Sequence, residues 1–507
     1  MAEAERTAEA ENHVPPGESD QRERPPIARR PVFAVAAVAA VVHLVVATRF
    51  GWHRDEFYYV LCGRHPDWGY VDQPPLAPLL ARLAADLPGG VLPLRLLAIA
   101  AQIGCVLSAS VLAAEFGGRR RAQTLAAAAV AACPVFVAAS MLFGTTVLDQ
   151  LCWLAVLVLT AGALRVRTTR AWLAAGLVAG IGLQTKDTLA VLLIGIVVGL
   201  ITFRRDALRS RGPWLAGLLA FLVAVPNVIW DARHQWANLH MARALADQQG
   251  GPLGALSQVP VLVLLLAGPP LIALWYSGVR HLISREGRDH RWLLAAAAVI
   301  LALFTVSGGK VYYAAPVLAG LFAAGAVRVE SLATERRRWR WPLAVAGSAT
   351  IAIVIGLPVL PPRAETALRP INPQAMETYG WPRFVDQIAR AAAPLPAGVP
   401  IFASNYGEAG AVSILGPAAG LHRTVLSGHN NYLFWGPPPG KSDTVLCVGQ
   451  WNTAYLHRFW SQVTEIAPLT LPDGLTDQET AQHAAIYLCT LPRGTWAQLW
   501  PDLRHLD

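Results

Sequence analysis

Three carboxylates, several aromatic rings and a double proline follow the first hydrophobic segment of the chain. They lie in His53-Arg54-Asp55-Glu56-Phe57-Tyr58-Tyr59 and in Trp68-Gly69-Tyr70-Val71-Asp72-Gln73-Pro74-Pro75-Leu76. Carboxylates are costly to place beside hydrocarbon, so their presence there indicates a function. A carboxylate within hydrogen-bond reach can accept the proton of an attacking hydroxyl. The segment therefore predicts chemistry at a membrane surface, with Asp55, Glu56 and Asp72 as its carboxylates.

Three more charged residues stand at the ends of later hydrophobic runs. Asp149 opens one such run, and Lys186 and Lys310 each lie between two others. A lysine or an arginine can stabilise the negative charge of a departing phosphate. Group transfer from a phosphate donor to a hydroxyl needs both kinds of charge. These residues, together with Arg54, supply both on what we expect to be one face of the membrane.

Each carboxylate also has a purely structural interpretation. Asp55 could cap a short helix over Glu56–Leu61, because Asp is a favoured N-cap residue. Glu56 and Asp149 could be first-turn charges that answer the helix dipole. Asp72 could be a turn residue ahead of the double proline.

The cations and the aromatic side chains have structural alternatives as well. Lys186 and Lys310 could be interfacial anchors whose ammonium groups reach out of the hydrocarbon. Tyr312 and Tyr313 fit an interfacial aromatic belt as well as the wall of a substrate site. The residue types and their spacing leave these alternatives open.

Long hydrophobic runs are the elements that must position these residues. Of the 507 residues, 54% are hydrophobic and 15% are charged, and the mean hydropathy is +0.40. A soluble domain carries about 25% charged residues. The runs predict about eleven membrane-spanning helices. Their expected ranges are 31–49, 91–115, 122–140, 146–164, 171–185, 188–203, 213–230, 257–278, 291–307, 311–328 and 341–360.

Positive charge is concentrated in every second loop between these runs. The basic loops contain Arg29-Arg30, Arg119-Arg120-Arg121, Arg165 to Arg170, Arg204 to Arg211, His281 to Arg291 and Arg336-Arg337-Arg338. Because Lys and Arg collect on the cytoplasmic side, we expect the N-terminus inside and the acidic loops outside. The net charge of +9 is then a topology signal and predicts no nucleic-acid partner.

The two ends of the chain differ from the hydrophobic part. Residues 1–30 are polar and predict a disordered cytoplasmic tail, not a cleaved signal peptide. After residue 360, short apolar runs at 399–403, 444–448 and 486–489 predict the buried strands of an extracytoplasmic α/β domain. Cys447 and Cys489 fall in two of these runs, and their spacing leaves open whether they pair.

At these motifs the chain resembles glycosyltransferase family 39, which includes protein O-mannosyltransferases and lipid A aminoarabinose transferases. The resemblance rests on Arg54-Asp55-Glu56 with Tyr58-Tyr59, on Tyr70 to Leu76, on Leu148-Asp149, on Thr185-Lys186 and on Gly309-Lys310-Val311-Tyr312-Tyr313. Asn405 to Gly410 and Ser427 to Tyr432 resemble a bacterial branch of the family. The likeness covers most of residues 31–440.

The resemblance implies a GT-C fold and an inverting transfer of a sugar from a polyprenyl-phosphate donor. The acceptor would be a protein, lipid or glycan outside the cytosol. Asp55 corresponds to the family's base, Glu56 adjoins it, and the resemblance places Asp149 near the acceptor or the base. Asp72 corresponds to the position where some members hold a divalent metal ion. Some relatives have Glu-Lys-Pro where this chain has Asp72-Gln73-Pro74, so the positive charge is missing here. Metal dependence therefore stays open.

The residues expected to bind substrate follow from the same motifs. Around the donor they are Arg54, Tyr58, Tyr59, Asp72, Lys186, Lys310, Tyr312 and Tyr313, with the phosphate assigned to the three cations. In the C-terminal domain, His429 and Asn430 are expected to contact an acceptor glycan. A strand–turn unit with packed aromatic side chains explains these last two residues equally well.

We therefore expect a tail at 1–30, a GT-C catalytic domain at 31–360 with an external loop at 50–90, and a soluble domain at 361–507. The expected location is the plasma membrane of a bacterium. A transporter or flippase for lipid-linked sugars is the main alternative, and an inactive glycan-binding protein is a third. A transporter predicts charges near the bilayer midplane in broken helices, whereas the acidic residues here cluster at one surface.

Overall fold

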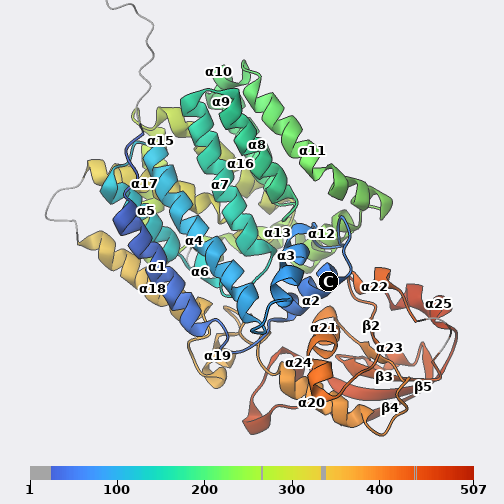
Figure 1. Ribbon diagram of the computed structural model, residues 1–507. Helices are drawn as coiled ribbons and strands as arrows, with labels where there is room; N and C mark the ends of the chain where they lie inside the picture. The colour runs from blue at the N-terminus through green and yellow to red at the C-terminus, as the bar shows by residue number, and fades with distance from the viewer. Residues whose placement is uncertain (1–23, 264–266, 333–338, 439, 441, 507) are drawn as a thin grey trace, which may run out of the picture.

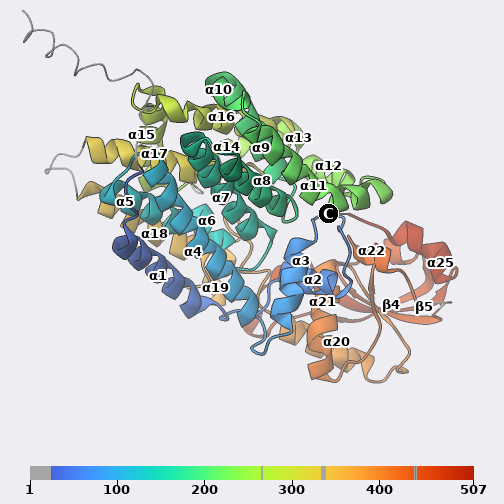
Figure 2. The same ribbon diagram turned by 45° about the horizontal axis from the view of Figure 1, so that its top comes forward.

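The chain folds into a bundle of helices and a smaller domain that contains a sheet (Figure 1). The computed structural model describes residues 24–263, 267–332, 339–438, 440 and 442–506. The predicted tail lies outside the described residues up to position 23, and so does the basic group Arg336 to Arg338. The sheet domain lies at one end of the bundle, with helices α2 and α3 between them (Figure 2).

Hydrophobic helices build the bundle, as the apolar runs predict. They are α1 (Arg29–Val46), α4 (Leu92–Glu115), α5 (Arg120–Ala131), α6 (Pro134–Ala139), α7 (Thr145–Val166), α8 (Thr169–Leu183), α9 (Leu189–Phe203), α11 (Gly212–Arg233), α15 (Ile272–Ile283), α16 (Arg291–Val306), α17 (Val317–Ser331) and α18 (Arg340–Gly356). Within the described residues, five helical segments are long and apolar enough to cross a membrane: α1, α4, α7, α11 and Arg288–Val306, which includes α16. Their outer faces carry exposed apolar side chains such as Val45 on α1 and Phe221 on α11, a surface that suits lipid.

Two expected spans are interrupted, so the prediction of single helices there is wrong. In the described part of the run 257–278, α13 (Gly251–Ser257) ends, α14 (Val259–Val261) follows, and α15 begins after the 3-10 helix at Pro269–Leu271. Pro269 and Pro270, behind Gly268, break it, because proline lacks the amide hydrogen that a helix interior needs. Pro134 likewise divides the run 122–140 into α5 and α6.

Short helices fill the segments between the spans. The external loop contains α2 (Arg54–Arg64) and α3 (Leu76–Ala85), and α12 (Ala237–Gln248) follows α11. The expected helix Glu56–Leu61 lies inside α2. Its N-cap, however, is His53, whose side chain accepts from the amide of Asp55. Asp55 therefore does not cap the helix, and its carboxylate is available for other contacts.

The basic loops meet at the end of the bundle that lies away from the sheet domain. Glu115 pairs with Arg24 at 3.0 Å and with Arg165 at 2.8 Å. The carboxylate of Glu330 accepts the amide hydrogens of Arg119 and Arg121, and the Arg204 side chain donates to the carbonyl of Asp289. Helix α10 (Arg205–Leu208) marks this end at the top of Figure 1. The acidic loops lie at the other end, next to the sheet domain.

The C-terminal part is an α/β domain built on a five-stranded sheet, in the order β2-β1-β3-β5-β4. Strands β1 (Ile401–Ala403), β2 (Val425–Ser427) and β3 (Thr444–Gly449) are parallel, whereas β4 (Trp460–Pro468) and β5 (Ala485–Pro492) form an antiparallel edge. The three predicted apolar runs coincide with β1, β3 and β5. Helices α20 (Trp381–Ala392) and α21 (Tyr406–Leu415) carry the core on the side that faces the bundle.

Short elements complete the chain. In the bundle they are η2 (Pro269–Leu271), η3 (Arg288–His290) and η4 (Val311–Ala314). In the C-terminal part they are α19 (Pro362–Leu368), η6 (Gly416–Ala419), α22 (Tyr432–Trp435), α23 (Thr453–Leu456), η7 (Pro472–Gly474), α24 (Gln478–Ala481), α25 (Trp496–Leu499) and η8 (Trp500–Leu503).

Two features of the sheet domain bear on earlier expectations. Cys447 and Cys489 are free and buried. They lie on neighbouring strands two residues out of register, since Cys489 faces Val445. Their thiols nevertheless contact each other through a side-chain hydrogen bond. Phe57 and Tyr58 of α2 belong to the same core cluster as Trp381 of α20, so the external loop packs as part of this domain.

Candidate functional site

The first turn of α2 brings one exposed and one buried carboxylate to the boundary between the two parts. Asp55 keeps 35% of its side-chain surface exposed. One of its oxygens accepts a hydrogen bond of 2.7 Å from the hydroxyl of Tyr406, which begins α21. The Arg54 guanidinium lies over the ring of Tyr406, 4.6 Å from its centroid. The carboxylate is thus held on one side and accessible on the other.

Glu56, the neighbour of Asp55, is fully buried and completely engaged. Its two oxygens accept from the amides of His53 and Phe143, both at 2.9 Å. Its ion pair with Arg95 of α4 is also 2.9 Å long. These contacts close the capping box of α2 and fasten it to the bundle. They explain Glu56 by structure and leave it no oxygen directed to a substrate.

Glu377, from the segment before α20, completes the charged cluster around α2. Its carboxylate lies 3.0 Å from Nε2 of His53, and its carbonyl accepts from the amide of Arg54. Burial opposes ionisation of Glu377, yet His53, Arg54 and Lys310 together hold its pKa below the ordinary value. Burial also opposes a charge on His53, but the carboxylates of Asp55, Glu377 and Glu56 raise its pKa. Lys310 therefore lies close enough to this cluster to act on it.

Asp72 lies on the second part of the external loop and binds Tyr58. The Tyr58 hydroxyl donates to Asp72 at 3.0 Å and accepts from the amide of Asn431 at 3.2 Å. Although part of the Asp72 side chain is accessible, burial raises its pKa to about 7, and the Tyr58 hydroxyl offsets only part of this. The negative charge of Asp55 adds to the rise. Asp72 thus titrates near neutrality.

Asp149 and Lys186 occupy a separate position inside the bundle. Asp149 is buried and accepts from the indole of Trp153 at 3.0 Å and from the hydroxyl of Thr188 at 2.7 Å. Lys186 donates to the hydroxyl of Thr146 at 3.2 Å and lies over the ring of Tyr313, 4.2 Å from its centroid. The two charges interact, but both already have partners from the bundle.

Aromatic side chains lie between the Asp55 cluster and the Asp149–Lys186 pair. The rings of Tyr312 and Tyr313 are 4.7 Å apart, and the charge of Asp55 acts on both Tyr312 and Tyr59. Tyr59 hydrogen-bonds Thr145 at the start of α7, the helix that carries Asp149. The tyrosines predicted to bind substrate therefore lie between Asp55 and the Asp149–Lys186 pair.

His429 and Asn430 lie behind this region in the sheet domain, and both are buried. Nδ1 of His429 accepts from the amide of Tyr406 at 3.3 Å, and its ring stacks on His505 at 4.7 Å. Asn430 has a left-handed backbone with φ of 48°, and its amide donates to the carbonyl of His505. These contacts give both residues a supporting position and do not place them on an open surface.

The contacts of Asp72 bear on the predicted metal site. Within the described ranges, no group of three or more His, Cys, Asp and Glu side chains is arranged to hold a metal ion. Asp72 directs an oxygen to the hydroxyl of Tyr58, and a tyrosine hydroxyl that donates a hydrogen bond is not a metal ligand. A divalent ion at Asp72 therefore stays a prediction from the resemblance.

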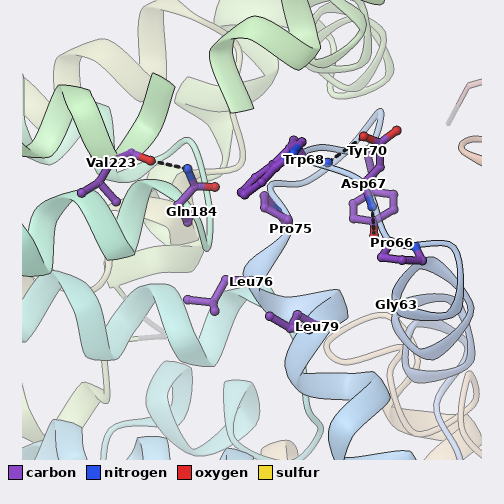
Figure 3. A pocket seen from close by; sticks show the side chains of 10 residues that line it. All are labelled: Gly63, Pro66, Asp67, Trp68, Tyr70, Pro75, Leu76, Leu79, Gln184 and Val223. Atoms are coloured by element: carbon purple, nitrogen blue, oxygen red, sulfur yellow. Dashed lines mark hydrogen bonds between the residues drawn. The ribbon is translucent and has the colours of Figure 1, made fainter. Parts of the chain in front are cut away.

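An apolar cavity of about 650 Å3 lies beside the external loop, not at Asp55 (Figure 3). Trp68, Leu76 and Leu79 line it from the loop and α3, and Gln184 and Val223 line it from α8 and α11. The Gln184 amide is turned aside, because it donates to the carbonyl of Val223 at 2.6 Å. Asp67 and Tyr70 also line the cavity, but most of its surface is apolar and suits hydrocarbon.

Three residues of this region were not identified from the sequence as site residues. Tyr406 stands in the motif Asn405 to Gly410, but the sequence did not indicate which residue its hydroxyl would bond. Glu377 carried no local signal. Arg95 lies in a hydrophobic run, where a buried charge predicts a functional or paired residue, and this rule would have singled it out.

Comparisons with known proteins agree with this architecture. Residues 72–230 match the family described as dolichyl-phosphate-mannose-protein mannosyltransferase. No curated protein matches the chain. ArnT from Cupriavidus metallidurans superposes with a TM-score of 0.60 in the apo state, at 13% identity over 90% of this chain and 97% of that chain. Its structure bound to undecaprenyl phosphate gives 0.60 at 14% identity, with the same coverage of 90% and 97%.

Arabinofuranosyltransferase AftD from Mycobacteria gives a TM-score of 0.55 at 12% identity, over 91% of this chain and 40% of that chain. At such identities the similarity concerns the fold. It confirms the predicted fold class, a helical membrane bundle with a C-terminal sheet domain.

Proposed function

We propose that this chain, a membrane-embedded protein with the GT-C fold and a mannosyltransferase-family segment at 72–230, moves a sugar from a polyprenyl-phosphate donor to an acceptor hydroxyl. The observation that carries the proposal is the state of Asp55. It is a partly exposed carboxylate at the membrane boundary, among cations and aromatic rings. The fold is that of GT-C glycosyltransferases. The predicted enzyme class, a glycosyltransferase that uses a polyprenyl-phosphate sugar, agrees with this fold.

Asp55 acts as the base in this proposal. An acceptor hydroxyl attacks the anomeric carbon, its proton passes to Asp55, and the bond between that carbon and the phosphate oxygen breaks. The attack comes from the face opposite the phosphate, so the configuration inverts. A carboxylate in this role contributes about 10²- to 10⁴-fold to the rate.

The cations stabilise the departing phosphate. Lys310 acts on Glu377 in the Asp55 cluster, and Arg54 flanks Asp55 directly, so both support this role. Lys186 lies deeper, against Tyr313, and contributes from that side. The tyrosines between the two positions are suited to contact the sugar ring, since aromatic faces pack well against its C–H groups.

The apolar cavity beside Trp68 supports a lipid-linked donor. Val223 and Gln184 come from helices α11 and α8, whose outer faces are apolar, and the same loop carries Asp72. We propose that a prenyl chain enters here from the bilayer. The undecaprenyl phosphate bound by ArnT is a ligand of this chemical type.

We propose an orientation with the N-terminus in the cytosol and the C-terminal domain outside, in the plasma membrane of a bacterium. The support is the separation of charge along the bundle. The basic loops gather at the end away from the sheet domain, and Lys and Arg favour the cytoplasmic side. The acceptor would then be a protein, lipid or glycan outside the cytosol.

The test is sugar release from a panel of polyprenyl-phosphate sugars by the purified protein in lipid, with Asp55→Asn alongside. Turnover of one donor that is lost in the variant supports the proposal. Binding of donors without cleavage of any, by a folded protein, would favour the transporter or flippase and refute the transferase. Lys310→Met adds a second arm, because loss of the cation should weaken cleavage while the base is intact.

A further inference from the structure

We propose that Tyr406 is a positioning residue for Asp55, so that the C-terminal domain completes the reaction centre. This inference rests on the proposed function, since it assigns a role relative to the proposed base. Tyr406 and Asp55 are 351 residues apart and belong to different parts of the molecule, yet their side chains share a hydrogen bond of 2.7 Å. A hydrogen bond to a carboxylate is among the stronger kinds in proteins.

The position of Tyr406 is fixed by the local structure of α21. Tyr406 is the first residue of the helix, and Asn405 is its N-cap in a capping box with Glu408. The Glu408 carboxylate also accepts from the amide and the hydroxyl of Ser404, at 2.9 and 2.7 Å. The amide of Tyr406 donates to His429. These bonds hold the backbone of Tyr406 in place, so its side chain leaves the helix in a set direction.

The ring of Tyr406 is also enclosed. The Tyr58 ring lies 4.7 Å from it on one side, and the Arg54 guanidinium lies over it. This leaves the hydroxyl directed at Asp55. His429 accepts the amide hydrogen of Tyr406, and this support of the Tyr406 backbone explains why His429 is buried.

Two glycines bring α21 against α2. A Cβ added at Gly407 would lie 2.8 Å from the Cβ of Arg54, and one added at Gly410 would lie 2.6 Å from the Cβ of Phe57. Such distances leave no space for a methyl group. Helices α2 and α21 lie side by side in both views (Figures 1 and 2). The approach of the helices therefore sets the distance between Tyr406 and Asp55.

The hydrogen bond has a chemical consequence for the proposed base. Tyr406 occupies one carboxylate oxygen, Oδ1, and so selects one orientation of the Asp55 side chain. The other oxygen lies 3.8 Å from His53 and remains free to meet an acceptor hydroxyl. Without the tyrosine hydroxyl, Asp55 samples several orientations, and fewer of them suit proton transfer. Donor binding, which depends on the cations and the apolar cavity, is unaffected.

The experiment compares Tyr406→Phe with wild type in the sugar-release assay in lipid. We expect kcat to fall about 10- to 100-fold with an unchanged KM for the donor, the range for loss of a hydrogen bond to a charged group. Tyr455→Phe is the matched control. It removes a hydroxyl that donates to the carbonyl of Asp502, in the same domain, and it should leave both constants unchanged. A Tyr406→Phe enzyme with wild-type kcat overturns the inference.

A second comparison separates positioning from a merely structural effect. In an Asp55→Asn background, Tyr406→Phe should add little, because the carboxylate that it positions is gone. An equal loss in both backgrounds overturns the inference. Gly410→Ala should reproduce the kcat loss by pushing α21 away, whereas Gly398→Ala, where an added Cβ meets no atom within 4 Å, should not. A wild type that cleaves no donor refutes the proposed function, and the inference with it. A wild type that turns over beside an unimpaired Tyr406→Phe refutes the inference alone.

Discussion

Asp55 lies in the first turn of α2 and Asp149 one turn into α7, on one side of the bundle, yet their surroundings differ. Asp149 is buried, and two donors from the bundle satisfy its oxygens. Asp55 is partly exposed, and its partner Tyr406 comes from the C-terminal domain. One site is complete within the bundle, whereas the other is formed by two parts of the chain.

The difference supports our proposal that the boundary between the two parts is the reactive region. A carboxylate with both oxygens bonded in the protein interior stabilises that interior, as Glu56 does beside Asp55. A carboxylate with one fixed and one accessible oxygen can accept a proton from a substrate. Under this proposal, substitution of Asp55 should lower the reaction rate, whereas substitution of Asp149 should lower stability.

The largest effect on rate is expected for Asp55→Asn. Asparagine retains an oxygen that can accept from Tyr406 but cannot take a proton, so kcat should fall about 10²- to 10⁴-fold. Sugar release measures the rate, and a thermal unfolding scan should find the melting temperature unchanged. A variant that retains near-wild-type turnover would remove Asp55 from the chemistry.

The largest effect on stability is expected for Glu56→Gln, one residue away. Removing this charge leaves Arg95 buried without its ion pair, which costs about 3–5 kcal/mol in comparable sites. Thermal unfolding in lipid should show a clear loss, and the surviving folded fraction should keep its turnover per molecule. Loss of turnover with normal stability would instead make Glu56 a catalytic residue, as the first-loop motif suggested.

Asp149→Asn should lower the stability of the protein, but by less than Glu56→Gln does. The amide group of asparagine cannot accept from both Trp153 and Thr188, so one donor is left unsatisfied at a cost of about 1–3 kcal/mol. Asp206→Asn, on an exposed side chain at the opposite end of the bundle, is the control. If Asp149→Asn reduces kcat as much as Asp55→Asn does, then the contrast between the two positions is wrong.

The fourth prediction concerns the pH dependence of stability through Asp72. Its folded-state pKa of about 7 lies above the value near 3.8 of an unperturbed aspartate, so the folded protein binds the extra proton between these limits. The free energy of unfolding should therefore fall as the pH rises from about 4 to 7. Asp72→Asn should remove this decline and be more stable than wild type at pH 8, with little difference at pH 4. Unfolding scans across this range measure it, and parallel curves for the two proteins would contradict the assignment.

Several elements could be predicted because they depend on local patterns. The ends of α4, α7 and α16 lie within a few residues of their apolar runs, since each run is long enough to cross a bilayer. The interruptions at Pro134 and at Pro269 were also visible as prolines, but the hydropathy of the runs concealed them. Strand β2 was missed because its three residues, Val425 to Ser427, do not lie in a longer apolar run as those of β1 do, and β4 because it is largely exposed.

The site could be predicted only in part. The motifs brought attention to Asp55, Asp149, Lys186 and Lys310, and the structure brings their helix ends to one region. Nothing local distinguished Asp55 from Glu56, because the difference depends on Arg95 and Phe143 of the bundle and on Tyr406 of the other domain. Partners this far apart follow no periodicity that a single sequence displays.

By itself the sequence determined the class of molecule, because long apolar runs leave a chain no alternative to membrane helices, and basic loops bias their orientation. It also determined which charged residues lie so close to hydrocarbon that their placement requires a function or a charged partner. The tertiary structure decided which of them keeps a carboxylate oxygen accessible at the boundary of the two parts. The reach of a side chain and its remaining hydrogen-bond capacity depend on neighbours that only folding brings within about 3 Å. The tyrosine that holds Asp55 is the clearest case, because close packing at two glycines of α21 brings it there.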